Sequence, residues 1–415
     1  MFEWSDTDLM VRDAVRTFID KEVRPNLDAL DSGEMLPYPI LRKLYADFGI
    51  GALAEESLNK QLAAKRAAAE GGEKPAAEGK DRSGGAFDQQ SMMAVVTSEL
   101  SGVCMGLCSS LGVSTGLGGA TILSRGTLAQ QERWVPDIFS LRTIACWAIT
   151  EPDSGSDAFG GMKTCVRRDG DEYILNGQKT FITNGPFADT LVVYAKLDEG
   201  DGTPARDRKV LTFVLDKDMP GLTQGKPFKK MGLHASPTGE LFFDNIRLGR
   251  DRLLGETEEH RGGDGRESAR SSFVAERVGI GFMALGVINE CLRLCTDYAR
   301  NRRLWGQEIG RFQLIQLKLA KMEVARINVQ NMVFNIIERG KAGKPLSLSE
   351  ASAVKLYSSE VATEVAMEAV QLFGGNGYMS EYRVEQLARD AKSLMIYAGS
   401  NEIQVTHVAK GILGG

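Results

Sequence analysis

The chain has 415 residues, of which 43% are hydrophobic and 25% charged, so it is long enough for two or three domains with a large buried core. Its net charge of −5 and its lack of a basic block argue against a nucleic-acid-binding protein. No apolar run reaches the roughly 18 residues that span a bilayer, and the acidic N-terminus, MFEWSDTDLM, is unlike a signal peptide, so we expect a soluble, cytoplasmic protein.

Helical periodicity runs through residues 5–55 and 88–130, where apolar residues recur at i, i+3 and i+4 spacing. It predicts an α-helical domain over residues 1–140. Within it, residues 59–85 are rich in Ala, Gly, Lys and Glu and nearly free of large apolar residues. We interpret this stretch as a polar insertion that is solvated or disordered.

The pattern changes to period two from about residue 142. Four segments alternate in polarity and are separated by Gly, Asp, Asn and Pro turns: YILNGQKTFITNG, TLVVYAKL, KVLTFVLD and GELFFDNIRL. They predict an all-β domain, barrel-like or a sandwich, over residues 141–255. Long helical stretches then fill residues 268–415. One of them begins at a capping box, Ser347 to Glu350, and Ser400–Asn401 followed by Glu402 is typical of a further capped helix start.

The cysteines predict buried thiols rather than disulfides or a metal site. Six cysteines are few for this length, and the pairs Cys104/Cys108 and Cys291/Cys295 lie in apolar, helix-like sequence. The three histidines lie far from them along the chain, so no metal site is expected.

Several short stretches carry groups that suit a flat cofactor. WAITEPDSGSD, residues 147–157, crowds hydroxyls and backbone amides into one turn, and KTFITNG places Phe181 and Thr183 on one face of a strand. In NRRLWGQEIGRFQ, arginines beside Trp305 fit a pyrophosphate and an adenine, although a basic helix end favoured by the helix dipole has the same composition. The glycines of QLFGGNGY lack the strand and helix context of a Rossmann motif, but their amides can meet a phosphate.

In this order, these stretches resemble the acyl-CoA dehydrogenase family. The matching segments are WAITEPDSGSD, NGQKTFITNG, KMGLHASPTGEL, RNRRLWGQEIGRFQ, LFGGNGY and YAGSNEIQ. The resemblance covers about residues 90–410 and the N-terminal helices. It implies an N-terminal helical domain, a middle β domain and a C-terminal four-helix bundle. It also implies bound FAD, α,β-dehydrogenation of a fatty or branched acyl-CoA to the trans-2-enoyl-CoA, electron transfer to an electron-transfer flavoprotein, and a homotetramer built as a dimer of dimers.

The resemblance also implies roles for individual residues. Those expected around the isoalloxazine and ribityl groups of FAD are Trp147, Ile149, Thr150, Gly155, Ser156, Phe181 and Thr183. Those expected at the diphosphate and adenine of a neighbouring subunit's FAD are Arg302, Trp305, Phe312, Gln313, Gln371, Gly374 and Gly375, while Ser400 and Glu402 border the cofactor. Those expected at the acyl-CoA are Ser156, Phe273, Tyr397 and Gly399, with Arg277 near the 3′-phosphate–adenosine end of CoA.

The reaction needs a base for the α-proton and a donor to the thioester oxygen. Many family members carry the acid directly after the tyrosine of the last motif, but this chain has Ala398 there. The resemblance to the isovaleryl-CoA and long-chain branches, which place a glutamate before an arginine in an earlier helix, assigns the base to Glu276 instead. Its apolar surroundings should raise its pKa. The backbone amide of Ala398 can still serve as the oxyanion donor.

Three points stay open at this stage. The small side chain at Ala398 leaves volume for branched or longer acyl groups. His234 stands where arginine is frequent in the family, so its contacts should differ. An oxidase that reacts with oxygen, or a non-catalytic flavin- or CoA-binding relative, would share most of these motifs, although the presence of Glu276 favours catalysis.

Overall fold

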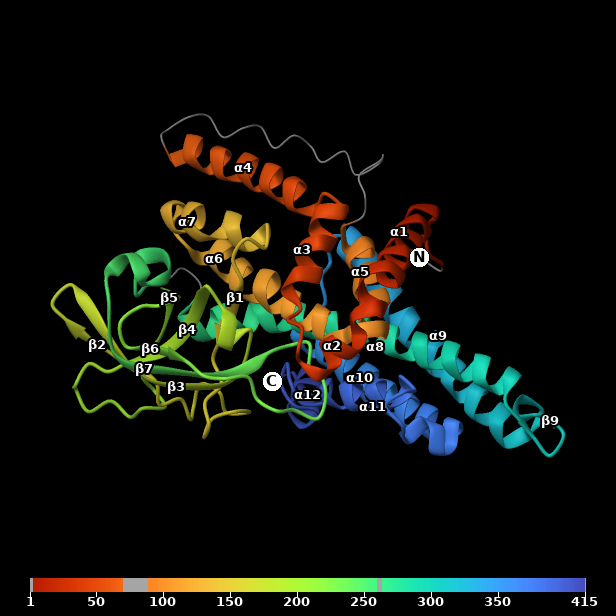
Figure 1. The fold of residues 1–415 in the computed structure, drawn as a ribbon. Helices are drawn as coiled ribbons and strands as arrows, with labels where there is room; N and C mark the ends of the chain where they lie inside the picture. Colours follow the sequence, from red (N-terminus) through yellow and green to blue (C-terminus); the bar gives the residue numbers. More distant parts are fainter. Residues whose placement is uncertain (1–2, 70–88, 260–262, 415) are drawn as a thin grey trace.

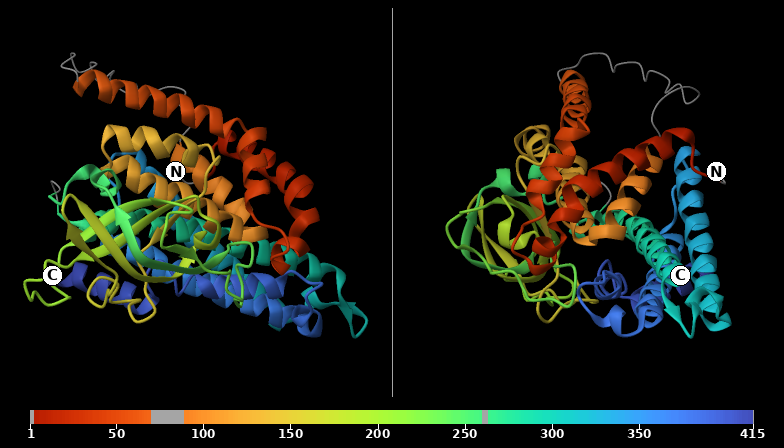
Figure 2. Two further views of the ribbon diagram at one scale, coloured as in Figure 1. Left: turned by 60° about the vertical axis from the view of Figure 1, so that its left-hand side comes forward. Right: turned by 45° about the vertical axis from the view of Figure 1, so that its right-hand side comes forward.

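A computed structural model describes residues 3–69, 89–259 and 263–414 of the chain. Three parts follow one another: N-terminal helices, a curled sheet, and long C-terminal helices (Figure 1). The predicted order of helical domain, β domain and helical bundle is therefore confirmed. The sheet lies against one end of the long helices, and the N-terminal helices cover the junction between them (Figures 1 and 2).

The N-terminal part combines the long helices α4 and α5 with shorter ones. Capping boxes set two of the starts, since the hydroxyls of Ser5 and Thr127 accept the amides of Asp8 and Gln130, whose side chains bond back. The helices are α1 (Asp6–Phe18), α2 (Leu27–Ser32), α3 (Tyr38–Asp47), α4 (Ile50–Ala69), α5 (Gln89–Leu111), α6 (Ala120–Arg125) and α7 (Leu128–Phe139).

The polar insertion was predicted to begin at residue 59, but the helix before it continues to Ala69. Residues 59–69 continue helix α4, which packs on α7 through the buried Leu58 and Leu62. Lys65 donates a 2.7 Å hydrogen bond to Gln131 of α7. The sequence reading missed this because one leucine among alanines and charged residues is enough to attach one face of a helix. Residues 70–85 lie outside the described residues.

The middle part is one seven-stranded mixed sheet whose path runs β1-β4-β2-β3-β7-β6, with β5 pairing β4. Strand β1 is parallel to β4, while the long pair β3–β7 is antiparallel. All four predicted strand segments are confirmed as β3, β4, β5 and β7. The strands are β1 (Ala145–Ala148), β2 (Cys165–Asp169), β3 (Glu172–Thr183), β4 (Thr190–Leu197), β5 (Val210–Asp216), β6 (Leu222–Gln224) and β7 (Thr238–Leu248).

The C-terminal part packs the long helices α8, α9 and α10 together, with α11 and α12 against α10. The predicted capping box at Ser347 and Glu350 opens α10. A small hairpin between α8 and α9 lies at the end of the bundle farthest from the sheet (Figures 1 and 2). The elements are α8 (Gly265–Asn301), β8 (Arg303–Leu304), β9 (Gln307–Glu308), α9 (Gln313–Lys341), α10 (Leu348–Phe373), α11 (Val384–Ser393) and α12 (Asn401–Leu413).

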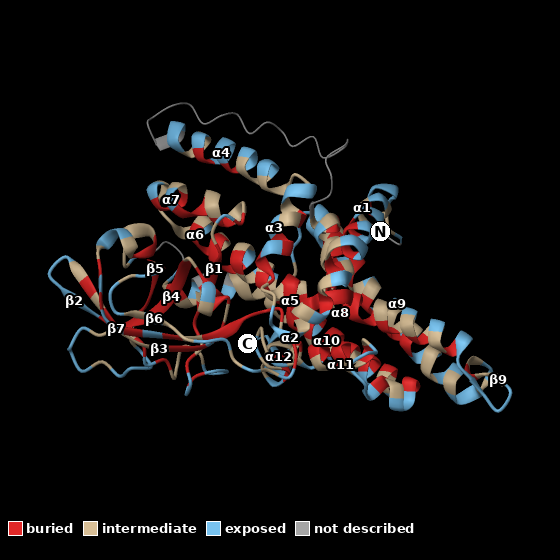
Figure 3. Ribbon diagram, viewed as in Figure 1, coloured by how far each residue is buried: buried red, intermediate tan, exposed pale blue. Residues whose placement is uncertain are grey.

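Burial is concentrated in the sheet and in α5, α8 and α10 (Figure 3). Cys104, Cys108, Cys291 and Cys295 are free and buried, as predicted, and burial raises the pKa of each thiol. By length and composition, residues 90–125 and 265–301 could each cross a membrane. Most of each apolar window is buried inside the fold, which is typical of core helices.

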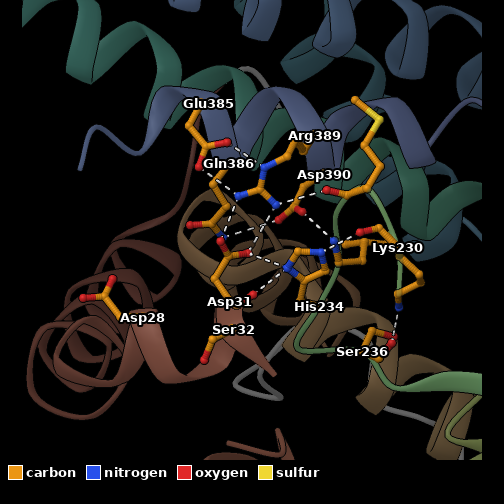
Figure 4. A network of polar contacts seen from close by, with 12 residues as sticks. Asp28, Asp31, Ser32, Lys230, His234, Ser236, Glu385, Gln386, Arg389 and Asp390 are labelled. Carbon is orange, nitrogen blue, oxygen red and sulfur yellow. Dashed lines mark hydrogen bonds and ion pairs between the residues drawn. The ribbon is translucent and has the colours of Figure 1, made fainter. Parts of the chain in front are cut away.

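A polar network ties all three parts together beside α11 (Figure 4). Arg389 of α11 pairs with Asp31 of α2 at 2.8 Å, and Asp390 accepts the Leu233 amide of the β6–β7 loop at 2.6 Å. Burial raises the pKa of Asp390 to about 6. The two ring nitrogens of His234 lie 2.5 and 2.7 Å from backbone carbonyl oxygens, those of Asp31 and Lys230. His234 therefore joins the β-domain loop to the N-terminal helices.

Candidate active site

Trp147 on β1 presents an unsatisfied donor at the boundary between the sheet and α8. Its ring meets those of Tyr194 and Phe273 edge-on, at 5.4 and 5.9 Å between centroids. Its indole Nε1 is buried and finds no acceptor among the residues that the structure describes. A buried donor without a partner is costly. The position therefore fits a polar, flat group that the chain itself does not supply, as FAD would be.

The loop after β1 is shaped by a buried ion pair that sequence analysis did not single out. Lys179 of β3 is fully buried and donates to Glu151 and to the Ile149 carbonyl, each at 2.9 Å. Glu151 also accepts the amides of Lys163 and Thr164. Burial lowers the pKa of Lys179 to about 8. Burial by itself would raise the pKa of Glu151, but the Lys179 cation and the hydrogen bonds that Glu151 accepts outweigh it. The pKa of Glu151 is therefore held below its usual range.

The rest of that loop is left open. The hydroxyl of Ser154 bonds back to the Asp157 carbonyl at 2.7 Å, so it is used within the turn. Gly155 and Ser156 are exposed at its tip, and the Thr150 carbonyl accepts the Thr180 amide at 2.9 Å. The tip can therefore offer amides and the Ser156 hydroxyl to a ligand.

Phe181 and Thr183 both lie outside the sheet core, which agrees with their predicted shared face. Thr180 and Ile182, which alternate with them, are buried, whereas the ring of Phe181 is 67% exposed. Phe181 has φ +57° at a shift in the β3–β7 register between Lys179 and Ile182. This irregularity lifts an aromatic ring off the sheet beside the loop that Lys179 holds.

Helix α8 carries the predicted base close in sequence to Phe273, whose ring meets Trp147. Glu276 lies one turn beyond Phe273, so both side chains share one face of α8. Glu276 is half-buried, and burial raises the pKa of its carboxyl to about 7, against the lowering effect of Arg277 and Lys355. A carboxyl with a pKa near 7 is suited to accept a proton at neutral pH.

Arg277 lies inside the bundle, not at its surface. Its side chain is 2% exposed, and Nη1 donates to Ser352 Oγ at 3.0 Å. A Cβ added at Gly399 would lie 3.6 Å from Nη2. The predicted place near the 3′-phosphate–adenosine end of CoA does not fit this buried position. Arg277 instead packs behind the turn where the thioester is expected.

The turn between α11 and α12 faces Glu276. Ala398 and Gly399 have φ of +58° and +81°, so two successive residues are left-handed. The Tyr397 ring is packed near Glu276, and burial raises the pKa of its hydroxyl. The amides of Ala398 and Gly399 donate no hydrogen bond within the described parts of the chain. This turn therefore has free donors at the place where the resemblance puts the thioester oxygen.

The helix start after this turn differs in detail from the prediction. Ser400 is the N-cap of α12, but no helix amide donates a capping hydrogen bond to its side chain. Asn401 turns inward, where its Oδ1 accepts Lys355 Nζ at 2.7 Å. Glu402 is exposed at the first turn, and its own backbone amide and the Ser400 hydroxyl hold its pKa below the usual range.

The expected diphosphate and adenine residues gather elsewhere, at the hairpin end of the bundle. Arg302 is exposed there, and the 86%-exposed ring of Trp305 lies 5.6 Å from that of Phe312. The break after α10 lies alongside, because Asn376 donates to the Tyr298 hydroxyl of α8 at 3.0 Å. The other predicted residues of this end are exposed as well: Gln313, Gln371, Gly374 and Gly375. The hairpin with β9 lies at the opposite end of the molecule from strand β1, which carries Trp147 (Figure 1).

Two further site residues escaped the sequence analysis. Lys355 and Gln404 hold the carbonyl side of the Ala398–Gly399 turn. Both are fully buried, although their residue types are usually exposed. Apart from Asn401 Oδ1, which accepts from Lys355, their partners are backbone carbonyl oxygens, which leave no mark in a sequence. The only available signal was their position among small and apolar residues of a helix.

Known proteins resemble the whole chain. Family models match the acyl-CoA dehydrogenase N-terminal domain at residues 75–142, the middle domain at 146–246 and the C-terminal domain at 263–413. An acyl-CoA dehydrogenase of Bacillus subtilis is 32% identical over 407 residues, 98% of each chain. The caffeyl-CoA reductase-Etf complex subunit CarC of Acetobacterium woodii is 32% identical over 97% of each chain. A glutaryl-CoA dehydrogenase of Mycobacterium smegmatis, solved in complex with FADH2, superposes with a TM-score of 0.82 at 26% identity, covering 99% of this chain and 96% of its own. The chain belongs to the acyl-CoA dehydrogenase family.

Proposed function

We propose that this protein is an FAD-dependent acyl-CoA dehydrogenase in which Glu276 removes the α-proton of the acyl thioester. The observation that carries the proposal is the position of Glu276. Its half-buried carboxyl, whose pKa burial raises to about 7, lies one helical turn from Phe273, whose ring meets Trp147, and close enough to Tyr397 of the turn to raise the pKa of that hydroxyl. FAD as the cofactor is supported by the family to which the chain belongs and by the similarity to a structure solved with FADH2.

Each site residue has its own role in the proposed reaction. The Ala398 amide donates to the thioester oxygen and so stabilises the charge that develops as the α-proton leaves. Glu276 accepts that proton, and its raised pKa makes transfer from a weak carbon acid less uphill. Trp147, Phe181 and the loop tip at Ser156 hold FAD, which supplies the hydride acceptor when bound. Phe273 and Tyr397 provide apolar walls that keep water from the reacting carbons.

Electron transfer separates a dehydrogenase from an oxidase. We expect anaerobic addition of acyl-CoA to bleach the oxidised-flavin absorbance, and an electron-transfer flavoprotein to reoxidise the flavin. In air without that partner, little peroxide should form. Fast stoichiometric peroxide release in air would instead identify an oxidase. An unbleached flavin with every acyl-CoA offered, from short to long and from straight to branched, would favour a binding protein without turnover.

The hairpin residues are proposed to complete the site of a second subunit, in the homotetramer that the resemblance implies. Glu276→Gln and Arg302→Met are each expected to be inactive, because one lacks the base and the other a cation for the FAD diphosphate. Oligomers mixed from the two variants should regain about a quarter of wild-type activity, because each two-fold pair of unlike chains contains one intact site. Arg300→Met, an exposed change on the same helix end, is the control and should stay active. Mixed oligomers without activity would contradict the shared site.

Acyl selectivity tests the proposal that the small Ala398 side chain leaves room for branched or longer groups. Ala398→Glu should lower kcat/KM for branched and long acyl-CoAs at least about tenfold relative to short straight ones, since the added side chain fills volume beside Cα. The position is already left-handed with a Cβ present, so the change adds little backbone strain. Steady-state rates over a chain-length series measure the effect. An unchanged substrate profile would contradict the volume argument.

A further inference from the structure

The Ala398–Gly399 turn is held from inside the bundle by a buried cation. Lys355 of α10 has no exposed surface, and its Nζ donates to the Gly399 carbonyl at 2.9 Å and to Asn401 Oδ1 at 2.7 Å. Gln404 of α12 donates to the Ala398 and Gly399 carbonyls at 3.1 and 2.7 Å. Both carbonyls of the turn are thus bound on the side away from the free amides.

This arrangement offsets an unfavourable backbone. A left-handed alanine is sterically strained, and Ala398 is followed by a second left-handed residue. Such a conformation persists only when its surroundings fix it. The bonds from Lys355 and Gln404 supply that constraint: Gln404 holds both carbonyls, and Lys355 ties the Gly399 carbonyl to the Asn401 side chain.

The charge of Lys355 also reaches the base. Charged and titratable groups face this region from each packed element: Glu276 and Arg277 of α8, Glu360 of α10, Tyr397 of the turn and Glu402 of α12. Burial and the Arg277 cation lower the pKa of Lys355 to about 8, so most of it stays protonated at neutral pH. In turn, Lys355 favours the ionised form of Glu276.

We propose that Lys355 is a positioning residue for the acyl-CoA reaction: its ammonium fixes the turn that presents the Ala398 amide and stabilises the carboxylate form of the Glu276 base. This inference rests on the proposed function, because it assigns Lys355 to the same site. It predicts two separable effects of Lys355, one on the geometry of the oxyanion donor and one on the charge state of the base. Gln404, which is neutral, has only the first.

The test compares Lys355→Met with Gln404→Met, and measures the rate of anaerobic flavin reduction by an acyl-CoA against pH. Lys355→Met should be about tenfold to a hundredfold slower at its plateau, as expected for a displaced donor. Its pH midpoint should also rise by about one unit, because removing a cation disfavours the carboxylate that the reaction needs. Gln404→Met should be slower with an unmoved midpoint. Lys410→Met, an exposed change on α12, should match the wild type in both.

Each outcome decides the proposal. A wild-type rate and midpoint in Lys355→Met overturns it, and a slower rate with an unmoved midpoint reduces Lys355 to a structural role. If Lys355→Met does not retain flavin, Lys355→Arg keeps the cation with a different shape. It should keep the wild-type midpoint, and a midpoint that rises by about one unit would overturn the proposal. If acyl-CoA fails to reduce the wild-type flavin, the proposed function fails with it. The Lys355 proposal alone would be contradicted if acyl-CoA reduced the flavin of the wild type and of Lys355→Met at the same rate and pH midpoint, but did not reduce that of Glu276→Gln.

Discussion

Glu276→Gln should retain yellow flavin and lose flavin reduction by acyl-CoA, with a rate at least about 10³-fold below the wild type. Glutamine keeps the shape and polarity of the side chain but cannot accept the α-proton. Trp147, Phe181 and the Ser156 loop are untouched, so the cofactor should remain bound. Stopped-flow absorbance under anaerobic conditions gives the rate, and the visible spectrum gives the flavin content.

The loss of activity in Glu276→Gln should not come from unfolding. The folded-state pKa of Glu276 is raised to about 7, so the folded chain binds its proton more tightly than the unfolded chain does. This group therefore costs stability as the pH rises through the window from its ordinary value to about 7. The neutral glutamine removes that cost, and the variant should melt no lower than the wild type at pH 8. Flavin bleaching at the wild-type rate in this variant would remove Glu276 from the mechanism.

Lys179→Met should cost about 3–5 kcal/mol of unfolding free energy, the largest stability effect expected here. The change leaves the Glu151 carboxylate, which is 5% exposed, without its cation, and the Ile149 carbonyl without its donor. Because this pair shapes the loop beside Trp147, the variant should also release flavin. Urea unfolding monitored by circular dichroism measures the first effect, and absorbance after gel filtration the second.

Two companion variants isolate the buried charge. Lys163→Met removes a 2.7 Å ion pair with Asp153 from the same loop, but both side chains are more than two-thirds exposed and screened by water, so the stability should hardly change. Glu151→Gln combined with Lys179→Met removes both charges and should recover a large part of the loss. If Lys179→Met cost no more than Lys163→Met, the buried pair would not be what holds the loop.

The fold followed from local pattern where the pattern was strong. Alternation over KVLTFVLD and GELFFDNIRL predicted strands, and Ser347 with Glu350 predicted the start of α10, because these signals depend on neighbours in sequence. The polar stretch after residue 59 was misinterpreted, since Leu62 continues the contact of Leu58 with α7 and Lys65 bonds to Gln131 of that helix. Tertiary contacts of a single residue are invisible to composition.

The site was predictable only in part, for a related reason. Glu276 and the Ala398 turn could be named because family motifs mark them, and the structure brings them side by side through Arg277 and Gly399. Arg277 was misplaced because a guanidinium in a sequence says nothing about its burial. Lys355 binds a backbone carbonyl, and such a partner carries no residue signature.

The pH dependence of wild-type flavin reduction tests the central claim most directly. The second-order rate constant at low acyl-CoA concentration reports the free enzyme, in which Glu276 has a pKa of about 7. The rate should therefore fall about tenfold per pH unit below that value and level off above it, because only the carboxylate can accept the α-proton. A rate that stays constant from pH 5 to pH 8, or a flavin that no acyl-CoA reduces at any pH, would contradict the account.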